Sequence, residues 1–224
     1  MTTGLLVNNS SGIIQIDQDY SNQIASSIIS KPAALSGDWL ALPSGVDMRQ
    51  ECPAIFVRSA GWVGNLSLTP YISSTPTPAG AIFYYSTAPV EFVFCSSLNP
   101  TRGGNMLEVY SPTGKLAYGS NQRYPRIVQM AQLNGSAVQT SVAAINDPSL
   151  WFCINPVVPG LSRPLGQGSD MSYPPYVHMC ALVGGAMSFK FIENGYATNG
   201  LAENSSLSPY NGRTCRIPIA YIPA

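Results

Sequence analysis

The sequence has little charge, and this shortage already excludes several functions. Only 10% of the residues are charged, against about 25% in an average soluble domain. The 11 Lys and Arg residues balance the 11 Asp and Glu residues, so the formal net charge is zero. Proteins bind phosphate backbones and anionic membrane surfaces through clustered Lys and Arg. We therefore expect no nucleic-acid partner and no binding to a membrane surface.

The residues that build common catalytic and metal sites are also scarce. His178 is the one histidine of the chain and stands in an apolar run, so we interpret it as a satisfied, partly buried side chain. The sequence lacks the glycine-rich phosphate-binding motifs and the nucleophile motif of serine hydrolases. A glycosidase carboxylate pair needs no local motif, so that reading stays open. Our prediction is a protein that is not an enzyme, with no cofactor, no metal ligand and no catalytic residue.

Long hydrophobic runs and paired cysteines are missing as well. The longest apolar run, residues 179–187, contains two glycines and is far shorter than the roughly 20 residues of a membrane helix. The five cysteines include no C-x-x-C pair, and an odd number cannot close entirely into intramolecular disulfides. Residues 1–8 have no basic segment and only a short apolar run, which predicts no secretion signal. We expect buried free thiols, no membrane insertion and synthesis in the cytoplasm.

What the chain does contain predicts β-structure. Its 20 glycines and 19 prolines are spread along the sequence and leave few windows for a long helix. We predict an all-β protein, an antiparallel β-sandwich that is either jelly-roll-like or made of two small sandwiches, with long Pro/Gly-rich loops. Residues 21–30 and 137–145 are the two windows compatible with helix, and their Ser, Ile and Val content favours strand. The strand-like runs are residues 54–58, 61–68, 81–86, 90–95, 126–133, 137–145, 150–154, 176–183, 186–192 and 214–222.

Two segments read as similar β-hairpins. Residues 4–17 and 106–119 each place apolar runs on both sides of a turn that contains glycine. Superposing Gly12 on Gly114, a shift of 102 positions (114 minus 12), also matches Val7 with Val109. The chain therefore reads as one all-β region over residues 1–224, with a subdivision into 1–100 and 101–224, each opening with a hairpin, as the alternative. Convergence of two hairpins and duplication of a unit both explain the pattern.

Residues 155–176 form the longest expected loop. This segment has 22 residues with five prolines and three glycines, and loops of such length in a compact domain usually have a function or are disordered. Tyrosine and arginine supply large, adaptable contacts at interfaces. Our hypothesis is that Arg163, Asp170, Tyr173 and Tyr176 contact a partner subunit or a receptor; a plain surface loop is the alternative.

The first hairpin resembles a known group of proteins. Residues 4–9 (GLLVNN), followed by residues 12–17 (GIIQID) and Tyr20, resemble the opening of small tail-tip and baseplate-associated proteins of tailed bacteriophages. Residues 107–120 have a similar form, with Gly119 where the group has an aspartate. The resemblance implies a virion structural protein of the distal tail, made in the bacterial host cytoplasm. It also implies a homo-oligomer around the tail axis, most simply a trimer, in contact with other virion proteins and with a host-surface receptor.

The low charge agrees with an assembled protein, because a surface with few charges is poorly protected from association. Two other functions stay open at this point. One is a capsid or capsid-decoration protein with a jelly-roll sandwich, and the other is a carbohydrate-binding or hydrolytic β-domain.

Overall fold

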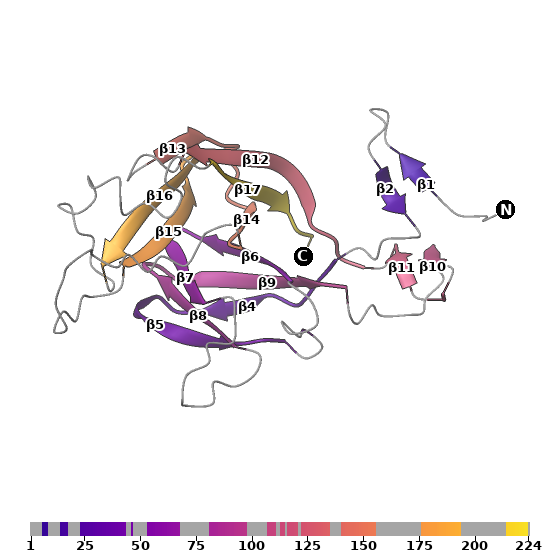
Figure 1. Ribbon diagram of the computed structural model, residues 1–224, viewed down its shortest axis with the longest axis horizontal. Helices are drawn as coiled ribbons and strands as arrows, with labels where there is room; N and C mark the ends of the chain where they lie inside the picture. The colour runs from indigo at the N-terminus through magenta and orange to yellow at the C-terminus, as the bar shows by residue number, and fades with distance from the viewer. Residues whose placement is uncertain are drawn as a thin grey trace, which may run out of the picture.

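The computed structural model confirms the all-β prediction. It describes residues 6–8, 14–17, 23–43, 46, 53–67, 81–97, 107–110, 113–114, 116–120, 122–134, 140–155, 176–193 and 214–223. Across these ranges every regular element is a β-strand and every strand pair is antiparallel, with no helix. Two large sheets and two small hairpins result (Figure 1).

The first large sheet has seven strands. In spatial order these are β12 (Arg126–Asn134), β17 (Thr214–Tyr221), β14 (Trp151–Cys153), β6 (Ala54–Ser59), β9 (Val90–Ser96) and, along the far edge of β9, β3 (Ile24–Ala25) and β4 (Ile29–Lys31). The edge is split between β3 and β4 at Ser26. Its N–H donates to the Phe94 carbonyl at 2.8 Å, and its hydroxyl accepts from the Phe94 N–H at 3.1 Å. The Ser26 side chain thus replaces a ladder bond where the strand breaks.

The second large sheet has six strands and packs face to face with the first. Its order is β13 (Thr140–Ala143), β16 (Ala186–Glu193), β15 (Tyr176–Val183), β7 (Val63–Ser67), β8 (Ala81–Ser86) and β5 (Ala34–Ala41). Inward side chains of both sheets form one apolar cluster. It includes Val57, Phe92, Phe152 and Ile219 from the first sheet and Leu40, Ile82, Tyr84 and Phe189 from the second. Full burial of each large side chain contributes about 1.5–3 kcal/mol, so this interface is the main source of stability.

The two halves of the chain use the sheets in the same way. In the first half β3/β4, β6 and β9 enter the seven-stranded sheet while β5, β7 and β8 enter the six-stranded sheet. In the second half β12, β14 and β17 enter the seven-stranded sheet, and β13, β15 and β16 enter the six-stranded sheet. Along the chain, the strands of both halves enter the two sheets in the same order. The halves join through the pairs β6–β14 and β7–β15. Both halves therefore build one shared sandwich. In each sheet the strands of the first half, read inward from one edge, follow the same order as the corresponding strands of the second half, read inward from the other edge.

A similar hairpin precedes each half. The first consists of β1 (Leu6–Asn8) and β2 (Ile14–Asp17), the second of β10 (Glu108–Tyr110) and β11 (Leu116–Gly119). Val7 pairs with Ile16 and Val109 with Tyr118, so a shift of 102 positions (109 minus 7) relates the registers, and the same irregularity follows each valine. Figure 1 shows the hairpins beside each other at one side of the sandwich, where β2 and β11 are in contact. That a duplication produced the two halves stays a hypothesis.

The predicted strands agree with the observed ones except near residues 21–41. The runs expected at 81–86 and 176–183 have the observed bounds, and the window 137–145 is strand at β13. Residues 21–30 contain β3 and the first two residues of β4, as their composition favours. Strand β5 was not expected from the sequence. Its Ser36, Gly37 and Asp38 interrupt the alternation of apolar residues, and its register with β8 shifts between Ala34 and Asp38.

Candidate functional site

The predicted loop contacts fall mostly outside the described residues. Arg163, Asp170 and Tyr173 lie outside the described residues. Tyr176 is the first residue of β15 and pairs with Glu193 of β16. The hypothesis that these four residues contact a partner or receptor therefore stays a prediction.

The described residues do form a cavity of about 530 Å³ at one end of the sandwich. It lies at the start of β14, and residues 145–148, which precede this strand, line it together with the end of β6. Phe152 pairs with Val57 and Cys153 with Phe56, and the ladder of β14 with β6 has no pair before Phe152. The cavity is lined by residues 30–31, 58–60, 89–91, 145–148, 150, 152 and 182–185. Both halves of the chain thus contribute to its wall.

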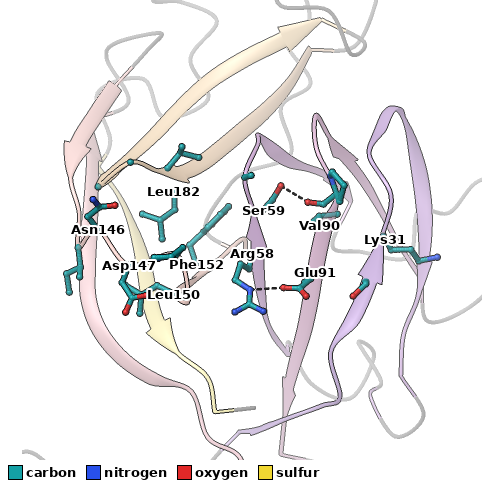
Figure 2. A pocket seen from close by; sticks show the side chains of 18 residues that line it. Lys31, Arg58, Ser59, Val90, Glu91, Asn146, Asp147, Leu150, Phe152 and Leu182 are labelled. Atoms are coloured by element: carbon teal, nitrogen blue, oxygen red, sulfur yellow. Dashed lines mark hydrogen bonds and ion pairs between the residues drawn. The ribbon is translucent and has the colours of Figure 1, made fainter.

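An arginine and a glutamate form one wall. Arg58 on β6 is opposite Glu91 on β9, and Arg58 Nε donates to Glu91 Oε2 at 2.6 Å. The Arg58 Cζ also lies 4.5 Å from the centroid of the Trp151 ring, a cation–π distance. Both side chains of the pair are about one third exposed, and such a pair adds little stability. Its main effect is to fix the guanidinium and the carboxylate side by side (Figure 2).

A short turn forms the opposite wall. The Ser149 N–H and hydroxyl donate to Asp147 Oδ1 at 2.8 and 2.7 Å, and the Leu150 N–H donates to the Asp147 carbonyl at 3.2 Å. The bonds from Ser149 lower the pKa of Asp147, so this side chain is a carboxylate across the neutral range. Asn146 precedes it and is exposed. Figure 2 shows Asn146 and Asp147 across the pocket from Arg58 and Glu91, while Lys31 extends away from the other labelled side chains.

The rest of the wall is held by hydrogen bonds between turns. The Ser59 hydroxyl donates to the Pro89 carbonyl at 2.9 Å and accepts from the Gly61 N–H at 3.1 Å. The Trp62 N–H donates to Thr87 Oγ1 at 2.9 Å. These bonds join the β6–β7 turn to the β8–β9 turn, so the cavity wall is preformed.

The floor of the cavity is apolar, and its lining has as many cationic as anionic side chains. Val90, Leu150 and Phe152 are buried, and Leu182 packs against them in the core cluster. The lining contains two cations, Lys31 and Arg58, and two carboxylates, Glu91 and Asp147. Such a site can bind a small ligand that has an apolar face and several hydrogen-bonding groups.

A second feature of interest is an exposed apolar strip on the edge strand β12. Ile127, Val128 and Met130 are 50%, 46% and 50% exposed. The register with β17 shifts between Ile127 and Gln129, so the ladder is irregular at Val128. Ile127 pairs with Ala220 and Met130 with Pro218, and residues directly opposite share a face. The irregularity therefore places Ile127 and Met130 on the same outer face of the seven-stranded sheet.

Several cysteines are buried free thiols, as expected. Cys95, Cys153 and Cys180 are buried and make no disulfide. Burial raises the pKa of Cys95 to about 12, and the neighbouring Cys153 acts in the same direction. Cys95 and Cys153 lie on β9 and β14, which flank β6, so one strand separates them.

Sequence reasoning missed the residues of the cavity. Arg58, Glu91 and Asp147 belong to three separate elements, and no local spacing links them. One local pattern was available, because Asp147-Pro148-Ser149 is typical of a turn in which an aspartate side chain binds the following backbone.

Comparisons of the chain with protein-family models, curated proteins and solved structures find no significant match. In the part of the chain that the structure describes, no group of three or more His, Cys, Asp or Glu side chains is placed to hold a metal ion. The same part includes no helix long and apolar enough to cross a membrane.

Proposed function

We propose that the chain is a structural subunit of a virion that assembles with copies of itself in the distal tail of a tailed bacteriophage. The observation that carries the assembly role is the exposed apolar strip of β12, formed by Ile127, Val128 and Met130. The resemblance of residues 4–17 to tail-tip and baseplate-associated proteins supports the place in the virion.

The strip has the character of an interface. Strand β12 has nine residues, and among the described strands β17 is its one ladder partner. Isolated proteins usually protect such edges with charges, bulges or a covering segment. Here the irregularity at Val128 disfavours continuous pairing with another strand, so the side chains of Ile127 and Met130 are the better contact surface. A copy that covers them would remove exposed apolar surface from water.

The neighbouring contacts hold this edge in place. Gln129 Nε2 donates to the Ala143 carbonyl at 3.2 Å, and the Ile145 N–H donates to Gln129 Oε1 at 3.0 Å. The Gln129 amide thus joins the edge of the first sheet to the end of β13 in the second. A fixed edge loses little conformational entropy on association.

The test is a charge placed on the strip. Met130→Lys should shift the mass measured by light scattering from an oligomer, a trimer by our proposal, toward the 23.8 kDa of one chain. The matched control is Leu35→Lys on β5, which is 54% exposed at the opposite edge of the sandwich and should leave the mass unchanged. A wild-type chain that is monomeric at micromolar concentration contradicts the assembly role. An oligomer that survives Met130→Lys assigns the contact to another surface and contradicts the role of β12.

The place in the virion has its own test. Gold-labelled antibodies against the chain should mark the distal end of the tail in negatively stained particles. Label on the head would contradict the tail assignment and favour the capsid alternative.

A further inference from the structure

The cavity between Arg58 and Asp147 is not explained by assembly through β12. Its volume of about 530 Å³ lies within the range of small-molecule sites, and its floor of Val90, Leu150 and Phe152 is apolar. Hydrogen bonds between turns hold its walls without a ligand. A preformed pocket of this kind binds a ligand with little loss of protein entropy.

The charges of the lining disfavour an anionic ligand. Arg58 Nε lies 2.6 Å from Glu91 Oε2, so the carboxylate already neutralises the positive charge of the guanidinium. Asp147 adds a carboxylate that stays ionised at neutral pH, while Lys31, the other cation of the lining, extends away from the other labelled side chains (Figure 2). A phosphate or sulfate would have to bind beside two carboxylates. A neutral polar ligand avoids this repulsion.

The hydrogen-bonding groups fit hydroxyls. The guanidinium of Arg58 and the carboxylate of Glu91 lie side by side, one a donor and the other an acceptor. Two adjacent hydroxyls match this pair, because one can accept from the guanidinium while the other donates to the carboxylate. On the facing wall the exposed amide of Asn146 offers a donor and an acceptor, and Asp147 offers a further acceptor.

We propose that this cavity binds a neutral hexopyranose unit of a glycan. The sugar's C–H face packs against Leu182, which is partly buried against the core cluster of Leu150 and Phe152, and its hydroxyls bind Arg58 and Glu91 on one side and Asn146 and Asp147 on the other. A sugar ring combines an apolar face with vicinal hydroxyls, which is the combination that the floor and the walls present. In a virion protein such a site would contact the host-surface glycan, but the binding itself does not depend on the assembly role.

The experiment measures sugar binding to the full chain by saturation-transfer-difference NMR. The probes are the methyl pyranosides of glucose, galactose, mannose and N-acetylglucosamine, with methyl glucuronide and glucosamine as charged counterparts. We expect at least one neutral pyranoside to give a signal and the charged counterparts to give a weaker one. No signal from any neutral probe, or a stronger signal from a charged one, overturns the proposal.

Two variants locate the site. Asn146→Ala should weaken binding about two- to tenfold, the effect of one lost hydrogen bond. Glu91→Gln removes the charge of the pair with little change in shape and should also weaken binding. The control is Gln132→Ala, another exposed side-chain amide, on β12, which should bind as the wild type does. Thermal melts check that all three fold.

Sugar binding that is unchanged in both Asn146→Ala and Glu91→Gln overturns the assignment to this cavity. The oligomer mass is measured on the same samples. A chain that assembles but binds no sugar refutes the cavity proposal alone, and one that binds sugar as a monomer refutes the assembly proposal alone.

Discussion

Replacing Gly37 by alanine tests the packing of the β5 edge. Gly37 has a φ of +83°, in the left-handed region that side chains other than glycine rarely adopt. A Cβ at this position would lie 2.4 Å from Phe83 Cζ and 3.1 Å from Tyr85 Cε1. The Phe83 ring thus occupies the space that the missing side chain leaves.

The expected loss of stability has two parts. The left-handed backbone costs an alanine about 1–2 kcal/mol. The clash adds a second cost, because the Phe83 ring must move and lose its edge contacts. These contacts join it to Trp39 at 4.9 Å and Tyr85 at 5.3 Å between ring centroids, and such contacts contribute about 0.5–1.5 kcal/mol each. We expect Gly37→Ala to lower the free energy of unfolding by about 3 kcal/mol.

Gly184→Ala is the matched control. Gly184 has a φ of +60° and no atom within 4 Å of the position of an added Cβ, so it measures the backbone cost alone. We expect a loss of about 1–2 kcal/mol there. For a chain of this size the melting temperatures should fall by about 6–12 °C for Gly37→Ala and about 2–8 °C for Gly184→Ala. Equal losses in the two variants, measured by urea unfolding, would refute the reasoning about Phe83.

Three further predictions concern titratable groups. Burial and the nearby Asp38 carboxylate raise the pKa of Tyr84 from 10.0 to about 12, so the folded chain holds this proton more tightly than the unfolded chain. Stability is therefore full below about pH 10 and declines up to about pH 12, a decline that urea unfolding should find smaller in Tyr84→Phe. Ser149→Ala should raise the pKa of Asp147 part of the way to its ordinary value, and an unmoved midpoint in a ¹³C carboxyl titration would contradict the role of the hydroxyl. Because burial raises the pKa of Cys95 to about 12, this thiol should resist iodoacetamide at pH 8 until the chain unfolds; fast labelling of the folded chain counts against this.

Most of the strands could be predicted because their residues carry a strong local preference. Runs such as residues 81–86 and 90–95 are rich in aromatic and β-branched side chains and are bounded by turn residues. Strand β5 lacks this property, because Gly37 and Asp38 stand in its centre and its stability comes from contacts with β8. Its place in the fold depends on tertiary packing that composition does not record.

The candidate cavity was harder to predict than the fold. Arg58 and Glu91 are 33 positions apart and meet because β6 and β9 pair in one register. Asp147 joins them from the other half of the chain, through the pairing of β14 with β6. Such a site can be recognised in a sequence only if the order of the strands in the sheets is already known. That order depends on pairs of strands that are far apart in the chain, which the local sequence does not show.

The position of the cavity follows from a difference between the two halves. Strand β6 has six residues, whereas β14, which takes the corresponding place in the second half, has three. By the register of Phe152 with Val57, Ser59 at the end of β6 lies beyond the first residue of β14, and the turn of Asn146 and Asp147 lines the cavity there. Ligand sites are often found where a chain departs from its own regular pattern, because the departure costs stability that a functional gain must offset. The cavity at the short end of β14 is therefore the place in this sandwich where we expect function beyond assembly.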